Sequence, residues 1–274
     1  MSYNKIQKSE IFKVKGKNGY QTNDYLAVET PLEIRLAHDN ENFKTLAITL
    51  CSPQDIDDLV YGYLFTENIV NSLNDIISIE IFDNEFGLIA EVILDLSVVY
   101  EKFLNKRHGM VHASCGLCGK TEFDDLLTYN YPRVKLTDKI IADDIVLSLP
   151  NKLNQQQRAF TKTGGLHASA LFNHVGELIL IKEDIGRHNA LDKLIGAALQ
   201  QKLLPLSDYI VLLSGRISFE LVHKALMTGV STLAAIGAPS SLSVEIAKVN
   251  GLRLIGFIKV DGYNLYNNIT LNNI

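Results

Sequence analysis

Two cysteines, Cys115 and Cys118, are the residues with the clearest capacity for chemistry in this sequence of 274 residues. A thiol reacts as its thiolate, and cations close by lower the pKa of a thiol. The surrounding stretch 102–120 contains four Lys or Arg residues and two His residues but no acid. Three glycines in the same stretch favour a loop over a helix or a strand. The pattern predicts a reactive thiol on a basic loop that a large partner can reach.

Three kinds of chemistry fit this cysteine pair. In sulfur carriage one cysteine holds a persulfide and passes its outer sulfur on, which requires a reactive thiol, a cationic setting and a second site for the acceptor. In dithiol redox chemistry the pair should follow a buried strand and open a helix, usually behind a Trp, and the chain contains no Trp. In a structural zinc site the ligands would be His108, His112, Cys115 and Cys118, although such sites usually join ligand pairs that lie further apart in the chain.

A reduced loop without a role is the remaining interpretation of the pair. It is disfavoured because exposed thiols oxidise and are a liability without a use. The third cysteine, Cys51, ends the apolar run Ile48-Thr49-Leu50, so we expect it to be an inert core residue.

A site for the sulfur acceptor is expected in the C-terminal half. Gly164 and Gly165 stand next to His167, and paired glycines permit close approach of the backbone to a ligand. A histidine that is only a hydrogen-bonded core residue is the alternative interpretation of His167.

Two arginines follow predicted strands at the point where a helix begins. Arg187 and Arg216 could each clamp a phosphate, because a guanidinium binds an anion in a bidentate manner and a helix N-terminus offers free N–H groups. Pro239-Ser240-Ser241 stands at the next such junction. A capped helix start within a solvated charge cluster is the alternative for the stretch 183–193. The three junctions predict an electropositive crevice for a phosphorylated small molecule, and the sequence has no GxGxxG or Walker A motif for a standard dinucleotide or ATP site.

The elements that must position these residues alternate between strand and helix in the C-terminal half. Such alternation implies parallel crossovers and a layered α/β domain that binds ligands at the carboxyl ends of its strands. The predicted strands are 177–182, 208–213, 232–236 and 253–259, and the predicted helices are 187–200, 219–228 and 242–249.

The N-terminal half is predicted to be a smaller α+β unit. Strand-like alternation is expected over 24–38, interrupted at Thr30-Pro31, and strands are expected over 44–50, 76–82 and 88–94. A helix should start at Ser52-Pro53, with Ser52 as the N-cap and Pro53 in the first turn. We place the boundary between the two domains at 138/139, so that the N-terminal domain includes the basic loop.

Composition excludes several classes of function. The formal charge of −5 makes the chain a poor general binder of nucleic acid. The N-terminus lacks the apolar run of a signal peptide, and no stretch is apolar enough to span a bilayer. Three cysteines are too few for a disulfide scaffold, so the expected compartment is the reducing cytoplasm.

Taken together, the motifs resemble the FdhD family of formate dehydrogenase accessory sulfurtransferases. The resemblance covers most of the chain from about residue 25, and five motifs occur in the family's order. They occupy residues 114–120, 163–168, 183–193, 214–218 and 237–243 and read SCGLCGK, TGGLHA, EDIGRHNALDK, SGRIS and GAPSSLS.

The resemblance implies a sulfur relay. A cysteine desulfurase would pass sulfur to Cys115 as a persulfide, with Cys118 assisting or resolving the intermediate. The acceptor would be the molybdenum bis(molybdopterin guanine dinucleotide) cofactor, bound as a substrate before it enters formate dehydrogenase. Family members are expected to be homodimers, with a C-terminal domain that resembles the cytidine deaminase fold and holds no permanently bound metal.

The family's cofactor segment near the C-terminus corresponds here to Phe257-Ile258-Lys259-Val260-Asp261-Gly262. Many relatives carry Arg-Gly in this segment. Lys259 keeps the charge but loses the bidentate fork of an arginine. Deaminase chemistry is excluded because His167 is followed by Ala168-Ser169, which lacks the required H-x-E glutamate.

Overall fold

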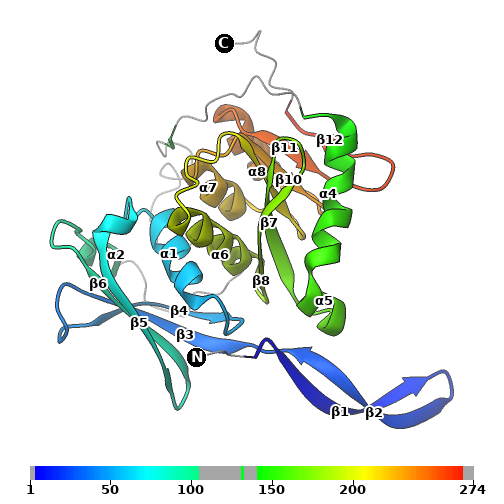
Figure 1. Ribbon diagram of the computed structural model, residues 1–274, viewed down its shortest axis with the longest axis horizontal. Coiled ribbons are helices and arrows are strands. Elements are labelled where there is room, and N and C mark those ends of the chain that lie inside the picture. The colour runs from blue at the N-terminus through cyan, green and yellow to red at the C-terminus, as the bar shows by residue number, and fades with distance from the viewer. Residues whose placement is uncertain (1–3, 105–130, 133–140, 268–274) are drawn as a thin grey trace.

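The computed structural model describes residues 4–104, 131–132 and 141–267, which form a mixed α/β fold with three separate sheets (Figure 1). The cysteine pair Cys115 and Cys118, the zinc alternative's His108 and His112, and the predicted boundary at 138/139 lie outside these residues. Within the described residues, no helix is both long and apolar enough to cross a bilayer.

A four-stranded sheet forms the core of the N-terminal part, in the order β4-β3-β6-β5. Alternate residues of these strands are buried against α1 (Ile56–Thr66), as expected for a sheet with one covered face. The predicted strands are confirmed as β3 (Thr30–Ala37), β4 (Lys44–Cys51), β5 (Ile76–Asn84) and β6 (Gly87–Leu94). Two short helices, η1 (Leu73–Asp75) and α2 (Glu101–Leu104), flank the last two strands.

The predicted start of the first helix is wrong by one turn. The helix begins at Ile56, after Asp55 in a left-handed conformation with φ 54°. Ser52 does not cap it, because its backbone N–H donates to Asp184 and its hydroxyl accepts from the N–H of Ile185. The groups of Ser52 are therefore used in a contact with the C-terminal part of the chain.

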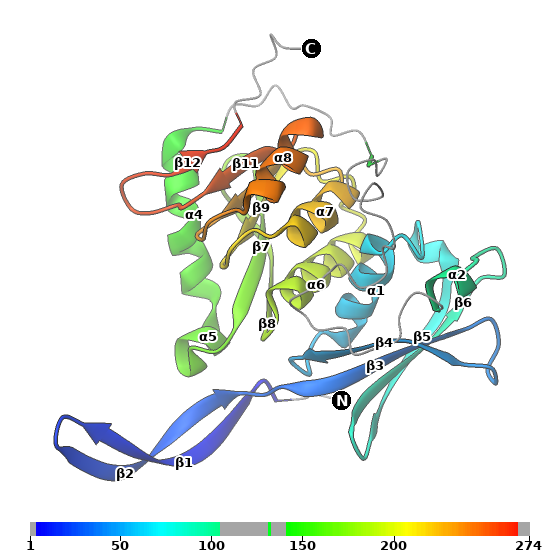
Figure 2. The same cartoon turned by 180° about the vertical axis from the view of Figure 1, so that it is seen from behind.

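An antiparallel hairpin, the arm, precedes the four-stranded sheet and projects from the body of the molecule (Figures 1 and 2). Its strands are β1 (Ile6–Lys15) and β2 (Asn18–Ala27). The strand pattern predicted over 24–38, with Thr30-Pro31 as its interruption, therefore divides into the end of β2 and all of β3. The chain leaves one sheet after Ala27 and enters another at Thr30, and no strand was predicted over residues 6–23.

A six-stranded sheet forms the C-terminal part, in the order β12-β11-β10-β9-β7-β8. The predicted parallel crossovers hold for β9, β10 and β11, but β7 is inserted antiparallel between β8 and β9. A tight turn at Asn173–Glu177 explains this, since it joins β7 and β8 as a hairpin. The strands are β7 (His167–Asn173), β8 (Leu178–Asp184), β9 (Tyr209–Leu213), β10 (Thr232–Ala235), β11 (Arg253–Gly256) and β12 (Asn264–Leu265).

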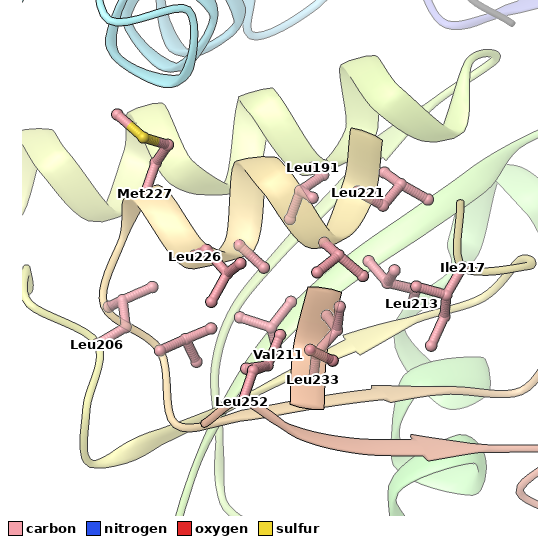
Figure 3. Packing of buried hydrophobic residues seen from close by; sticks show 14 of the residues in the cluster. Leu191, Leu206, Val211, Leu213, Ile217, Leu221, Leu226, Met227, Leu233 and Leu252 are labelled. Carbon is pink, nitrogen blue, oxygen red and sulfur yellow. The ribbon is translucent and has the colours of Figure 1, made fainter. Parts of the chain in front are cut away.

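Helices cover both faces of this sheet. On one face α6 (Arg187–Gln200), α7 (Phe219–Met227) and α8 (Ser241–Val249) pack over a core of leucines and other aliphatic residues (Figure 3). On the other face α4 (Asp143–Gln156) packs against β7 through Leu149 and Phe172. The three helices of the first face agree with prediction, whereas α4, α5 (Arg158–Thr163), β7 and β12 were not predicted.

The two parts of the chain meet where α1 crosses α6. A methyl group added at Gly62 would lie 1.8 Å from the carbonyl oxygen of Asp192, and one added at Gly196 would lie 1.9 Å from that of Asp58. The two helix backbones are therefore in direct contact, which only glycine permits. This crossing places α1 between the four-stranded sheet and α6.

Candidate functional site

The candidate site lies at one end of the strands of the six-stranded sheet, which is called the sheet edge below. Because β7 runs antiparallel to its neighbours, its first residue, His167, lies at the same edge as the carboxyl ends of β8 to β11. This is the edge at which layered α/β folds bind ligands. The structure brings together here, from separate parts of the chain, His167, Arg187, the stretches 214–216 and 237–240, and Phe257.

His167 and Arg187 both lie next to Gly215. A methyl group added at Gly215 would lie 3.3 Å from the His167 ring and 3.8 Å from Cδ of Arg187. Nδ1 of His167 is 3.5 Å from the hydroxyl of Ser214. Burial of the ring lowers the pKa of His167, and the cationic side chain of Arg187 lowers it further. The imidazole is therefore neutral at pH 7.

Arg187 has a donor that the protein does not use. Its Nε atom is buried and meets no hydrogen-bond partner among the described residues. Arg187 is also the first residue of α6, and the N-cap residue Gly186 supplies no side-chain cap. A buried donor without an acceptor is costly, so an anion bound here would satisfy both the guanidinium and the helix start.

His188 connects the first turns of two helices behind this site. Its Nε2 atom lies 3.2 Å from the hydroxyl of Ser218 and 2.6 Å from the carboxylate of Glu220. Ser218 is the N-cap residue of α7, so these contacts fix the start of α7 relative to the start of α6.

The loop that follows β9 and the loop that follows β10 approach each other closely. A methyl group at Gly237 would lie 2.6 Å from the carbonyl oxygen of Gly215, and Ile217 forms an isolated bridge with Pro239. Arg216 is exposed beside them. Ser240 caps α8 by accepting from the N–H of Ser243, so its hydroxyl is engaged within the protein.

The glycine pair has a structural role. Gly164 ends α5 with φ 67°, and its N–H donates to the carbonyl of Phe160, which is a common helix C-cap. A methyl group at Gly165 would meet the side chain of Ala27 at 3.4 Å. The pair therefore joins α5 to β7 and lies beside the base of the arm.

The predicted cofactor segment presents one aromatic side chain. Phe257 is 41% exposed at the sheet edge and has a left-handed backbone with φ 54°. Ile258 is buried in the core against the other face of the sheet. The N–H of Lys259 donates to the carbonyl of Gly262 in a turn that exposes Lys259, Val260 and Asp261. This turn ends β11 at Gly256 rather than at residue 259 as predicted.

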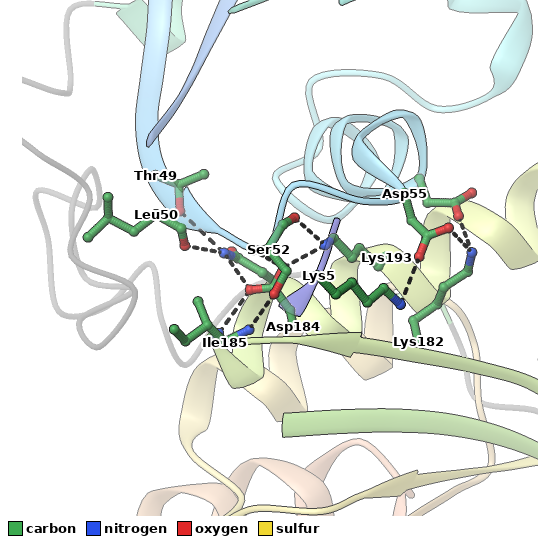
Figure 4. A network of polar contacts seen from close by, with 12 residues as sticks. Lys5, Thr49, Leu50, Ser52, Asp55, Lys182, Asp184, Ile185 and Lys193 are labelled. Carbon is green, nitrogen blue, oxygen red and sulfur yellow. Dashed lines mark hydrogen bonds and ion pairs between the residues drawn. The ribbon is translucent and has the colours of Figure 1, made fainter. Parts of the chain in front are cut away.

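The alternative of a solvated charge cluster over 183–193 is wrong, because Asp184 and Lys193 are completely buried. The two side chains form an ion pair at 2.6 Å (Figure 4). Lys193 also donates to the carbonyl of Ser52 at 2.9 Å, and Asp184 accepts from the N–H of Ser52 at 3.0 Å. A second buried pair, Asp192 with Lys224 at 2.9 Å, lies further along α6. The sequence did not lead us to predict that these charges form buried ion pairs, although charged residues within an otherwise apolar helix are a signal of such pairs.

Cys51 behaves as predicted. Its side chain is buried in the core of the four-stranded sheet. Burial raises the pKa of the Cys51 thiol to about 12, so the thiol is protonated and unreactive at neutral pH.

A cavity of about 640 Å³ lies away from the candidate site. It opens between the end of α1 and the ends of α6 and α7, and its lining includes Phe65, Leu199 and Met227. None of the predicted site residues that the structure describes lines it.

Comparison with known proteins shows the family. Residues 27–270 match the FdhD/NarQ family. Proteins named sulfur carrier protein FdhD are similar along most of their length. The one from Saccharolobus solfataricus is 37% identical over 262 residues and covers 96% of both chains, and the one from Streptomyces avermitilis is 42% identical over 256 residues, covering 89% of this chain and 87% of its own.

The fold also resembles a solved structure, that of a formate dehydrogenase accessory protein from Desulfotalea psychrophila. The TM-score is 0.74 and the sequence identity 21%, with 97% of this chain and 98% of that chain covered. The likeness extends the family assignment to the arrangement of the elements. The chain therefore belongs to the FdhD/NarQ family.

Proposed function

We propose that this protein is a sulfurtransferase that prepares a molybdenum cofactor for formate dehydrogenase in the cytoplasm. Its relatives bear the name sulfur carrier protein, which supports sulfur transfer in general. The specific carrier is Cys115. The Cys115 thiolate attacks the outer sulfur of a persulfide on a cysteine desulfurase, and the desulfurase thiolate leaves. One S–S bond forms and one breaks, so this step needs no external oxidant.

The acceptor is the molybdenum bis(molybdopterin guanine dinucleotide) cofactor, a substrate of this protein. The outer sulfur leaves Cys115 as a formally neutral atom, and the Cys115 thiolate is the leaving group. The metal gives up two electrons as it takes the sulfur as sulfide, which balances the step. Cys118 lies three residues away and is suited to resolve a persulfide that fails to find its acceptor.

The observation that carries this proposal is the unpartnered Nε of Arg187 beside neutral His167 at the sheet edge. A phosphate of the guanine dinucleotide would accept a hydrogen bond from Arg187 and from the open first turn of α6. Phe257, exposed at the same edge, offers an aromatic surface. The exposed side chains of Arg216 and Lys259 add positive charge around them.

Mass spectrometry after incubation with a cysteine desulfurase and cysteine tests the carrier step. The expected result is a gain of one sulfur atom, located on Cys115 by peptide analysis and absent in Cys115→Ala. Cys51→Ala is the matched control and should gain sulfur normally, because that thiol is buried and protonated.

Metal analysis of the same samples distinguishes sulfur carriage from the competing interpretation, a structural zinc site. No sulfur on Cys115 of the folded, reduced protein would refute the carrier role. One equivalent of zinc that is lost in the His108→Ala/His112→Ala variant would then favour a cofactor escort without sulfur chemistry.

A further inference from the structure

The start of α7 lacks the side-chain cap that its sequence offers. Ser218 is the N-cap residue, and serine is preferred at this position because its hydroxyl can accept from the free N–H groups of the first turn. In this protein the hydroxyl of Ser218 makes no such bond and lies 3.2 Å from Nε2 of His188 instead. Ser218 therefore contributes to a contact between two helices rather than to the stability of its own.

His188 makes a second, shorter contact with the same helix. Its Nε2 atom lies 2.6 Å from the carboxylate of Glu220, in the first turn of α7. A carboxylate can only accept, so Nε2 carries a proton and donates it. The two side chains are only 7% and 15% exposed. Hydrogen bonds to charged groups are strong where so little water competes, so this bond joins the start of α6 firmly to the start of α7.

The loop that leads into α7 carries one of the two arginines of the candidate site. The loop covers residues 214–218 and includes the exposed Arg216. The N–H of Ile217 donates to the carbonyl of Ala238 at 2.9 Å, which ties the loop to the one that follows β10. Towards α6, the loop continues into the first turn of α7, and that turn is what His188 contacts.

The residue before His188 reaches the same loop. A methyl group added at Gly215 would lie 3.8 Å from Cδ of Arg187, so the aliphatic part of the arginine lies next to the backbone of the loop. The buried Nε of Arg187 meets no partner among the described residues. Two consecutive residues of α6 thus approach one loop from the same side. Arg187 brings a donor that is left for a ligand, and His188 brings a bond within the protein.

We propose that His188 is a positioning residue of the candidate site, which holds the loop 214–218 against the start of α6 so that Arg187 and Arg216 bind one anion together. His188 does not touch the ligand. Without His188, the loop loses its bond to α6, and the carboxylate of Glu220 loses this cationic or donating partner beside a site for an anion. As in the proposed function, on which this inference rests, the ligand is a guanine nucleotide.

Two substitutions of His188 separate its bond from its bulk. His188→Gln keeps a donor, because the amide nitrogen of glutamine can take the place of Nε2, whereas His188→Leu fills similar space and donates nothing. Titration calorimetry with GDP should give an affinity close to wild type for His188→Gln. The affinity of His188→Leu should be lower by about 2- to 30-fold, the range for residues that act without touching the ligand.

Gln200→Ala is the matched control. The side-chain amide of Gln200 donates to the carboxylate of Asp58 at 2.6 Å, at the opposite end of α6 and exposed to solvent. This variant therefore removes another bond between α6 and a carboxylate, and it should leave the GDP affinity unchanged. Equal affinity of wild type and His188→Leu would overturn the inference. So would an affinity of His188→Gln as low as that of His188→Leu, because the donor would then not be what matters.

Amide-resolved hydrogen exchange without ligand tests the positioning independently of the proposed function. The N–H of Val222 donates to the carbonyl of Ser218 at 3.2 Å in the first turn of α7. Its exchange should be faster by about 10-fold or more in His188→Leu, since a hydrogen bond to a charged group is lost, and should return towards wild type in His188→Gln. Unchanged exchange in His188→Leu would overturn the inference. A wild type that does not bind GDP would instead refute the ligand of the proposed function, and exchange would still decide whether His188 holds the loop.

Discussion

Arg187 is the first residue of α6, and its buried Nε meets no acceptor among the described residues. A buried donor without an acceptor is costly, and an anion would satisfy it, which makes this residue a sensitive probe of the site.

Replacing Arg187 with Ala should weaken the binding of GDP by about 10- to 100-fold, because a hydrogen bond to a charged group contributes about 1.5–3 kcal/mol. Titration calorimetry measures the affinity. A second readout is the pKa of His167, which should rise in the variant because a nearby cation is lost.

The control for this experiment is Arg253→Ala. Arg253 is the first residue of β11, so it lies at the opposite edge of the sheet. Equal GDP affinity in wild type and Arg187→Ala would remove Arg187 from the site.

Burial raises the pKa of the Cys51 thiol to about 12, well above that of an exposed thiol. At pH 8 its thiolate fraction should therefore be lower by a factor of about 1,000. We expect iodoacetamide to label Cys51 in the unfolded protein and to leave it unmodified in the native protein over the same time. Labelling of native Cys51 at the unfolded rate would contradict the burial of this thiol.

At the scale of elements, α6 joins the two parts of the chain through buried charges. Asp184, at the end of β8, binds both Lys193 of α6 and the backbone of Ser52. Asn189 adds a bond from its side-chain amide to the carbonyl of Leu50 at 2.8 Å. The segment that follows β4 is thus fixed to the start of α6, next to Arg187.

Removing one partner of the Asp184–Lys193 pair should be far more harmful than removing both. Asp184→Asn or Lys193→Met alone should lower the free energy of unfolding by about 3–5 kcal/mol, because an unpaired charge or donor remains buried. The double variant should lose less than the sum of the two. Urea unfolding followed by circular dichroism measures this cycle, and additive losses would show that the two side chains are not coupled.

At the scale of the whole molecule, the crossing of α1 and α6 makes the two parts of the chain depend on each other. The backbone contact at Gly62 and Gly196 leaves no space for a side chain. Both core clusters adjoin this crossing and share Phe65 at their margins.

We expect the sheets on both sides of this crossing to unfold in one transition, and Gly196→Ala to lower the stability of both together. Overpacking should cost about 1–3 kcal/mol or more, which outweighs the gain of up to about 1 kcal/mol in helix propensity. Hydrogen exchange read by mass spectrometry should show equal loss of protection in β6 and β9.

Gly262→Ala is the control, because its added methyl group meets nothing within 4 Å. A loss of protection confined to one sheet would show that the two parts are independent.

The sequence by itself determined the features that depend on neighbours in the chain. Apolar periodicity was enough to place α6 at its observed bounds and to find β5, β6, β9 and β10 within one or two residues. Residue types and spacing within short motifs also carried the family resemblance, which the comparisons confirm. The reactivity expected of Cys115 and Cys118 remains a prediction from the same local pattern.

Only the tertiary structure decided what depends on residues distant in the chain. The antiparallel insertion of β7, the burial of Asp184 with Lys193 and the use of Ser52 away from its helix all arise from long-range contacts, as between Ser52 and Asp184, 132 positions apart. A charged side chain looks the same in sequence whether water or an opposite charge surrounds it. The surroundings of Asp184 and Lys193 are set only when β8, α6 and the segment at Ser52 pack together, because the two charges are buried only in the assembled fold.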